Sequence, residues 1–257
     1  MSKSSGARDG SMTGRVGLIT GASSGLGRAT AIAMAEAGAN VALLARSRPD
    51  IERTAASVAA AGREALVLPV DVADEEQTIA AAEQAVADLG RVDVLVNVAA
   101  TDVPAPVVEL STPDWDRVLA VNLRAPFLLA RSLFPHMRRA GGGTIVNVSS
   151  VAGKRGWSNA AAYCASKFGL TGLTQALAAE GRPFGIRACV VYPGAMATSW
   201  GVWAAEDRRG AEAVPSSPTD ALPAGDVAAL IVWIASAPAD MVLNEVVVTP
   251  LLEKGWP

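Results

Sequence analysis

The fold class is decided by the stretch Thr20-Gly21-Ala22-Ser23-Ser24-Gly25-Leu26-Gly27, which joins an apolar run at 15–20 to a helical pattern at 28–37. Glycines let a backbone turn sharply and approach a pyrophosphate closely, and the helix that follows offers free N–H groups and a partial positive charge. A tight structural turn is the alternative interpretation. The stretch lies within a complete β-turn-α-β unit, and that context favours a phosphate-binding turn.

Outward from this turn, strand-like and helical segments alternate along the chain. We predict further strands at 41–45, 65–70, 92–96, 144–148, 186–191 and 245–248, and further helices at 50–61, 75–89, 112–139, 159–180 and 227–235. Pro126 is expected to bend the long helix. The strands are continuous apolar runs, as expected when both faces of a sheet are buried. The pattern predicts an α/β fold: a doubly wound parallel sheet of about seven strands with helices on both faces.

The length of 257 residues suits one large α/β domain. We expect a flexible N-terminal tail at 1–13 and a single Rossmann-like catalytic domain at 14–257, without a linker or internal repeat. The segment 194–222 breaks the alternation, because it is rich in proline and serine and carries Trp200 and Trp203. A loop of this length in a compact domain is usually functional, so we expect it to cover the substrate.

Composition argues against several classes of function. The net charge is -3 and no basic stripe is present, so nucleic-acid binding has little support. Cys164 and Cys189 have neither the spacing of a metal site nor that of a disulfide framework. The single histidine, His136, lies at an apparent helix end, where a surface cation is common, rather than in a recognisable Ser-His-Asp arrangement.

The chain also lacks the features of a secreted or membrane protein. No uninterrupted run approaches the ~20 apolar residues of a membrane span, and the polar start has no apolar core of a signal peptide. We therefore expect a cytoplasmic protein with reduced thiols that binds no membrane, no nucleic acid and no metal.

The end of the second predicted strand bears on the choice of cofactor. An NAD site usually places an acidic residue there to hold the ribose 2′-hydroxyl. Here Ala45 is followed by Arg46 and Ser47. A guanidinium pairs bidentately with a 2′-phosphate and stacks on adenine. An ordinary surface arginine is the alternative, but the pattern favours NADP (NADPH when reduced) over NAD.

The residues suited to chemistry lie further along the chain. Tyr163 and Lys167 are four apart in a predicted helix and share one face. A neighbouring ammonium favours the phenolate and lowers the pKa of a tyrosine, which makes Tyr163 a usable acid or base. Ser149 and Ser150 end a strand, where a hydroxyl either caps the strand or hydrogen-bonds a substrate carbonyl. Asn122 is an amide among apolar residues, and we expect it to hold a water against Lys167.

Together these motifs resemble those of the short-chain dehydrogenase/reductase family, in its compact single-domain branch, over residues 13–250. The resemblance implies a catalytic set of Ser150, Tyr163, Lys167 and Asn122. Ser150 rather than Ser149 matches the family, because it precedes Tyr163 by thirteen residues. The implied cofactor site consists of Gly21, Ser23, Ser24, Gly25, Leu26, Gly27, Arg46, Ser47, Asp71, Val72, Asn97, Ala99, Tyr163, Lys167, Pro193, Gly194, Met196 and Thr198.

The resemblance also implies individual roles. Asp71 contacts the adenine edge, while Asn97 and the Pro193-Gly194 turn position the ribose and nicotinamide. Lys167 holds the nicotinamide ribose, and Asn122 maintains a proton relay.

Two departures from the family pattern are visible. The usual Asn-Asn-Ala-Gly is here Asn97-Val98-Ala99-Ala100, which adds a methyl group near the cofactor. The segment 244–250 lacks the Asp-Gly-Gly that commonly follows the last strand in relatives that reduce 3-oxoacyl carrier-protein thioesters.

We therefore expect an NADP-dependent oxidoreductase that moves a hydride between the nicotinamide and a carbonyl or alcohol carbon. The alternative within this chemistry is a 3-oxoacyl-[acyl-carrier-protein] reductase. A sugar-nucleotide epimerase or dehydratase would be longer, and a non-catalytic cofactor sensor would not need the complete Ser-Tyr-Lys set that this chain keeps.

Aromatic residues suggest what the pocket accepts. Trp157, Trp200 and Trp203 are expected to enclose a small apolar or aromatic substrate, although packing on a neighbouring subunit is the alternative. Lys154 and Arg155 are either solvated charges or partners of an anionic substrate group. Related proteins pair the 112–139 helix and the Tyr163 helix across an interface. Small residues on the Tyr163 helix therefore predict a homo-oligomer, a tetramer or a dimer: Ala165, Gly169, Gly172 and Ala176.

Overall fold

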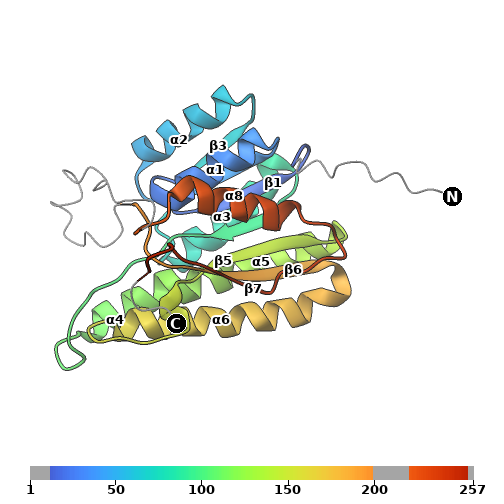
Figure 1. Ribbon diagram of the computed structural model, residues 1–257. Helices are drawn as coiled ribbons and strands as arrows, with labels where there is room; N and C mark the ends of the chain where they lie inside the picture. The colour runs from blue at the N-terminus through green and yellow to red at the C-terminus, as the bar shows by residue number, and fades with distance from the viewer. Residues whose placement is uncertain (1–11, 199–219, 254–257) are drawn as a thin grey trace.

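The computed structural model describes residues 12–198 and 220–253, and within them the chain forms one parallel sheet covered by helices (Figure 1). Its seven strands lie in the order β3-β2-β1-β4-β5-β6-β7, and every neighbouring pair is parallel. They are β1 Val16–Thr20, β2 Asn40–Ala45, β3 Ala65–Pro69, β4 Val94–Asn97, β5 Gly143–Val148, β6 Ile186–Pro193 and β7 Glu245–Val248. The predicted fold class is confirmed.

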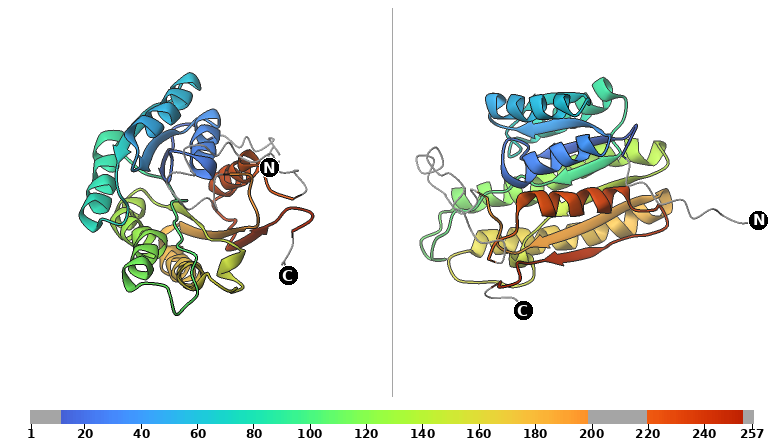
Figure 2. Two further views of the ribbon diagram at one scale, coloured as in Figure 1. Left: turned by 90° about the vertical axis from the view of Figure 1, so that its left-hand side faces the viewer. Right: turned by 45° about the horizontal axis from the view of Figure 1, so that its top comes forward.

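Helices flank the sheet in two layers (Figure 2). One layer holds α1 Gly25–Glu36, α2 Arg48–Ala60 and α8 Ala224–Ser236. The other holds α3 Glu75–Leu89, α4 Thr112–Leu119, α5 Ala125–Arg139 and α6 Ala161–Gly181. The described residues also form a π-helical segment, η1 Ala120–Arg124, and two short 3-10 turns, η2 Val151–Gly153 and η3 Arg182–Phe184.

The strands supply both layers of the core, because successive side chains point to opposite faces of a sheet. In β1, Ile19 packs with the α1–α8 layer and Leu18 with the α3–α5 layer. In β2, Leu43 packs with the α1–α8 layer and Leu44 with the α3–α5 layer. All four side chains are fully buried, which explains why the strands are continuous apolar runs rather than alternating ones.

The strand order reverses between β1 and β4, which is the switch point where sheets of this kind form a ligand-binding crevice. The chain winds from β1 to β3, then returns to the other side of β1 and continues to β7. Open α/β sheets bind ligands at such a switch point, outside the carboxyl ends of the strands. The Thr20 hydroxyl, at the end of β1, accepts hydrogen bonds from the N–H groups of Val98 and Ala99, both at 3.0 Å. This contact fixes the backbone that follows β4 at the crevice.

The predicted helix at 112–139 is helical throughout but changes type in the middle. Between α4 and α5 the chain forms the π-helical segment η1, and Pro126 falls in the first turn of α5. Proline has no N–H to donate, so it is tolerated where a helix begins. The sequence predicted a bend at Pro126, whereas the irregularity lies just before it and contains Asn122.

Several element boundaries also differ from the prediction. The first helix begins at Gly25 rather than at 28, and β4 extends to Asn97. Met12 is fully buried, and its N–H donates to the Ala37 carbonyl oxygen at 2.7 Å, so this residue packs with the domain rather than with the expected tail. Most of that tail lies outside the described residues.

One helical stretch, Thr112–Arg139, has the length and mean hydropathy (1.2) of a membrane-crossing helix. Half of its most apolar window is buried within the protein. Val121, Leu129 and Leu133 pack with strands of the sheet, so its apolar character is explained by the core.

Candidate active site

The glycine turn between β1 and α1 has the geometry that a phosphate group requires. Gly21 and Gly25 have φ values of +70° and +50°, a region that favours glycine. A Cβ at Gly27 would lie 2.2 Å from the Gly21 carbonyl oxygen, so no other residue fits there without rearrangement. Ser24, the N-cap residue of α1, makes no side-chain cap hydrogen bond, which leaves the first N–H groups of the helix for a ligand.

The segment after β6 reaches the same turn. The side chain of Thr198 would lie 3.6 Å from a Cβ placed on Gly25, so the two residues are neighbours. Met196 forms an isolated bridge with Leu222, which ties together the two described ends of the predicted substrate loop. The structure thus brings Thr198 beside the glycine turn, as the sequence predicted for a shared cofactor site.

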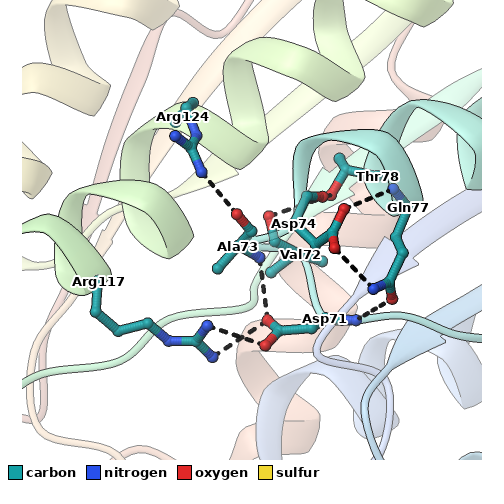
Figure 3. A network of polar contacts seen from close by, with 8 residues as sticks. All are labelled: Asp71, Val72, Ala73, Asp74, Gln77, Thr78, Arg117 and Arg124. Atoms are coloured by element: carbon teal, nitrogen blue, oxygen red, sulfur yellow. Dashed lines mark hydrogen bonds and ion pairs between the residues drawn. The ribbon is translucent and has the colours of Figure 1, made fainter.

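A polar network at the carboxyl end of β3 joins the expected adenine end of the site to α4 and η1 (Figure 3). The Arg117 guanidinium donates to both carboxylate oxygens of Asp71, at 2.9 and 3.1 Å. The Ala73 N–H donates to Asp71 Oδ1 at 3.1 Å, and Arg124 donates to the Ala73 carbonyl oxygen at 2.6 Å. Sequence reasoning missed both arginines, since no motif marks them and their partners lie far away in the chain.

The charge of Asp71 is set by this network. Burial alone would raise the pKa of Asp71, but the hydrogen bonds from Arg117 and Ala73 and the charges of Arg117 and Arg46 outweigh burial and lower it. Arg46 is exposed just after β2, and its charge acts on Asp71. The two residues therefore belong to the same end of the site, where an ionised carboxylate is available to accept a hydrogen bond from an adenine amino group.

Two buried asparagine side chains, Asn97 and Asn147, lie near the carboxyl ends of β4 and β5. Asn97 Nδ2 donates to Asn147 Oδ1 at 2.8 Å, and Asn147 Nδ2 donates to the Thr174 hydroxyl at 2.9 Å. The remaining oxygen, Asn97 Oδ1, is buried and has no hydrogen-bond partner in the described part of the chain. Such an orphaned acceptor indicates a ligand that brings a donor, for which a ribose hydroxyl is suited.

Lys167 adds a buried ammonium to this end. Its Nζ donates to the Val148 carbonyl oxygen at 2.9 Å, and within 12–198 and 220–253 it has no other hydrogen-bond acceptor. Burial lowers the pKa of Lys167 to about 7. With the orphaned oxygen of Asn97 and the glycine turn, this donor fits a nicotinamide dinucleotide, which Gly21, Gly25, Gly27, Asn97 and Lys167 would hold.

Ser150, Tyr163 and Lys167 converge as the sequence predicted. Lys167 Nζ lies 5.6 Å from the centre of the Tyr163 ring, on the same face of α6. The Ser150 side chain hydrogen-bonds the Tyr163 phenol, an interaction that favours the phenolate. By contrast, the Ser149 hydroxyl donates to the Lys167 carbonyl oxygen at 3.2 Å. Ser149 is therefore structural, and Ser150 is the serine that meets the tyrosine.

The expectation that Lys167 lowers the pKa of Tyr163 was wrong for this structure. Burial raises the pKa of Tyr163, and the charges of Asp102 and Cys164 add to that effect against the opposing hydrogen bond of Ser150. Removal from water disfavours the phenolate, and the same burial disfavours the Lys167 ammonium that was expected to stabilise it. The helical spacing was predicted, but the depth of burial was not.

The Asn122 side chain is hydrogen-bonded on both its oxygen and its nitrogen. Its Oδ1 accepts the Thr101 N–H at 2.8 Å, and its Nδ2 donates to the Thr101 carbonyl oxygen at 2.8 Å and to the Ser166 hydroxyl at 3.0 Å. These contacts hold the Asn122 amide against Thr101 and Ser166, and its role of holding a water against Lys167 stays a prediction. Asn122 positions the chain after β4 against η1 and α6.

Only some of the residues expected to bind substrate lie in the described part of the chain. Trp157 is half exposed, between Ser150 and Tyr163 in the chain. Trp200 and Trp203 lie outside the described residues. Lys154, considered as a partner for an anionic substrate, pairs instead with Glu245 and lies 4.4 Å from the centre of the Tyr192 ring.

One acidic side chain near the reaction centre was not foreseen. Asp102 follows β4, is only 9% exposed, and its charge acts on Tyr163. A single carboxyl in an irregular segment gives no sequence signal, because its distance from Tyr163 depends entirely on the fold.

A phosphate-binding turn at the switch point of a parallel sheet, followed by a Ser-Tyr-Lys set whose tyrosine and lysine are buried, defines a nicotinamide-dependent oxidoreductase. The chain belongs to the family described as short chain dehydrogenase, whose sequence profile matches residues 15–208.

Comparison with individual proteins supports this family assignment. The chain is 38% identical over 232 residues to a D-threitol dehydrogenase of Mycolicibacterium smegmatis, covering 90% of this chain and 89% of the relative. It resembles the crystal structure of a metagenomic short-chain oxidoreductase in complex with NADP, with 34% identity, coverage of 94% and 99%, and a TM-score of 0.80. It also resembles a carveol dehydrogenase of Mycobacterium avium in complex with NAD, with 25% identity, coverage of 93% and 97%, and a TM-score of 0.84.

Proposed function

We propose that this protein is an NADP-dependent carbonyl reductase or alcohol dehydrogenase with Tyr163 as its acid and base. One observation carries the proposal: Ser150 hydrogen-bonds Tyr163, and the buried Lys167 lies next to the Tyr163 ring. These residues lie at the end of the sheet where the glycine turn lies. Two similar proteins are named as dehydrogenases of alcohols, D-threitol and carveol, which supports the proposal.

The side chains divide the chemistry between them. In the reductive direction, the Ser150 hydroxyl hydrogen-bonds the substrate carbonyl oxygen, and the Tyr163 phenol transfers its proton to that oxygen. In the oxidative direction, the Tyr163 phenolate takes the proton of the substrate hydroxyl. The nicotinamide, when bound, supplies the hydride in one direction and accepts it in the other. Lys167 holds the nicotinamide ribose through the N–H groups that Val148 leaves available.

The preference for NADP rests on Arg46. This side chain is exposed after β2, directly following Ala45 where an NAD site usually carries an acid. Its guanidinium suits a 2′-phosphate. Relatives bind either NADP or NAD, so the preference is a property we assign to this chain on Arg46.

The substrate we propose is small, with an apolar or aromatic frame. Trp157 supports this, because it is half exposed, lies between Ser150 and Tyr163 in the chain, and offers apolar surface to a ligand. Binding pockets of this kind are mostly apolar with a few placed polar groups.

We also propose that the protein is a homo-oligomer. A groove of ≈ 560 Å³ lies between α4, η1, α5 and α6, with Leu119, Leu123, Phe127 and Leu173 among its lining residues. Phe127 on α5 and Phe168 on α6 are exposed by 43% and 47%. A Cβ on Gly172 would meet nothing within 4 Å, so a second helix has room to approach there.

A substrate panel tests the proposed function. The native protein is assayed with NADPH and with NADH against aryl ketones, aliphatic ketones and 3-oxoacyl thioesters, following nicotinamide absorbance. We expect turnover of ketones, faster with NADPH. Turnover of thioesters alone would favour the carrier-protein reductase instead, and no turnover of any carbonyl compound would refute the proposal.

A further inference from the structure

Asp102 is held at the reaction centre by the segments around it. The backbone N–H of its neighbour Thr101 donates to Asn122 Oδ1, and the Thr101 carbonyl oxygen accepts from Asn122 Nδ2, both at 2.8 Å. Further along, Ala105 forms a parallel bridge with Ala160, three residues before Tyr163 in the chain. The segment that carries Asp102 therefore runs between η1 and the start of α6, against the helix that bears the catalytic tyrosine.

The carboxylate of Asp102 is buried with little support. It is 9% exposed, and Oδ1 accepts the N–H of the adjacent Val103 at 2.8 Å. Among the residues that the structure describes, no other donor reaches this carboxylate and no cation pairs with it. It caps no described helix. A buried carboxylate in this condition is unfavourable for folding unless a partner satisfies it.

Asp102 also works against the catalytic residue. Its negative charge raises the pKa of Tyr163, and burial raises the pKa of Asp102 itself. Neither effect helps the fold or the proton transfer. Asp102 is unfavourable in both respects, and it lies in the segment that runs from Asn122 to the start of the Tyr163 helix. A buried carboxylate in that place is explained if it binds part of the substrate.

We propose that Asp102 is a specificity-determining residue that accepts a hydrogen bond from a hydroxyl group next to the reacting carbon of the substrate. The preferred substrates are then α-hydroxy ketones and the corresponding vicinal diols. This inference rests on the proposed function and narrows its substrate class. The apolar frame and the hydroxyl are compatible, since a mostly apolar pocket uses a few polar groups to orient its ligand.

The chemistry favours a hydroxyl over an ammonium group. A carboxylate is an acceptor and takes either donor. Burial already disfavours the Lys167 ammonium, which lies 5.6 Å from the centre of the Tyr163 ring, and a second cation nearby would disfavour it further. A neutral hydroxyl satisfies Asp102 without that effect. A site built to pair with a substrate hydroxyl also discriminates strongly against an analogue that lacks it, because the buried group is then left unpaired.

The experiment compares three ketones of one frame: acetophenone, α-hydroxyacetophenone and α-aminoacetophenone. Each is reduced with NADPH by the native protein, Asp102→Asn, Asp102→Ala and a control, Asp88→Asn. Asp88 is exposed near the far end of α3. Because a hydroxyl group itself activates the carbonyl, the decisive quantity is the change in the kcat/KM ratio of hydroxyketone to ketone between native and variant.

We expect Asp102→Ala to lower that ratio by about tenfold or more, the value of a charge-assisted hydrogen bond. Asp102→Asn keeps one acceptor oxygen and the shape of the side chain, so it should lower this ratio less. If the alanine variant does not fold, the asparagine variant provides the test. The Asp88→Asn ratio should equal the native one, and NADPH affinity should be unchanged throughout. An unchanged ratio in both Asp102 variants overturns the proposal, as does a larger loss for the aminoketone than for the hydroxyketone.

A binding measurement separates this inference from the proposed function. Ketone binding to the NADPH complex is followed by nicotinamide fluorescence, without turnover. If the native protein reduces none of the ketones, the proposed function fails. The inference still stands if the hydroxyketone binds more tightly than acetophenone and loses that advantage in Asp102→Ala, and it fails if the advantage is absent or persists.

Discussion

Arg117 of α4 donates to both carboxylate oxygens of Asp71, which lies in the loop after β3, 46 positions earlier in the chain. Because the pKa of Asp71 is lowered in the folded protein, the pair stabilises the fold above the ordinary aspartate pKa of 3.8. That contribution is lost as the pH falls through the lowered pKa of Asp71. The contact also connects the end of β3 to α4, which directly precedes the η1 segment that carries Asn122.

Arg117→Met is therefore expected to lower the free energy of unfolding at neutral pH. The loss should be below about 1 kcal/mol, since both side chains are partly exposed. It should disappear in strongly acidic solution, which urea denaturation at a series of pH values measures. Arg48→Met, which removes only an exposed pair with Glu52 at 3.5 Å, is the matched control. A loss that is equal at every pH would show that the ion pair does not cause it.

Arg46→Ala is expected to weaken NADP binding by about tenfold or more, as for loss of a charge-assisted hydrogen bond. NAD affinity should change little, because NAD has no 2′-phosphate. Fluorescence titration of the native protein and the variant with both cofactors checks this, with Arg48→Ala as a neighbouring control. Equal losses for both cofactors, or a native preference for NAD, would defeat the assignment.

Asp102→Asn should shift the pH profile of alcohol oxidation downward. The negative charge of Asp102 raises the pKa of Tyr163, so its removal makes the phenolate easier to form. The half-maximal pH of kcat/KM for a simple alcohol without a second hydroxyl should fall, while Asp88→Asn should leave it in place. A shift to higher pH would mean that Asp102 does not act on Tyr163 through its charge.

Phe127→Asp should dissociate the proposed oligomer. Phe127 lines the groove on the α4–α6 face and is 43% exposed, so the substitution places a charge in an interface without disturbing the core. Light scattering after size exclusion should show a larger species for the native protein and 26.2 kDa for the variant. Val108→Asp, at an 89% exposed apolar residue outside the groove, is the control. A native protein of 26.2 kDa at micromolar concentration would refute the oligomer.

The fold was predictable because its signals are local. The glycine turn and the continuous apolar strands each depend on a short stretch of chain, and together they define a doubly wound sheet. The convergence of Ser150, Tyr163 and Lys167 also followed, because a strand end and a helix spacing of four fix it.

The electrostatics of the site did not follow from the same patterns. Whether Lys167 lowers the pKa of Tyr163 depends on how deeply both are buried, which spacing does not reveal. The hydrogen bonds of the Asn122 amide with Thr101 and Ser166 were not foreseen either. These partners, like Arg117 on Asp71, come together only through tertiary packing.

The most direct test of the central claim is the activity of Tyr163→Phe. Removing the phenol oxygen removes the proton donor but keeps the ring, so kcat for ketone reduction should fall by ~10²–10⁴-fold with NADPH affinity nearly unchanged. Tyr192→Phe is the matched control, because Tyr192 is the other tyrosine of the chain and its hydroxyl contacts Thr171 outside the catalytic set. Activity of Tyr163→Phe within a few-fold of the native protein would contradict the assignment of Tyr163 as the acid and base.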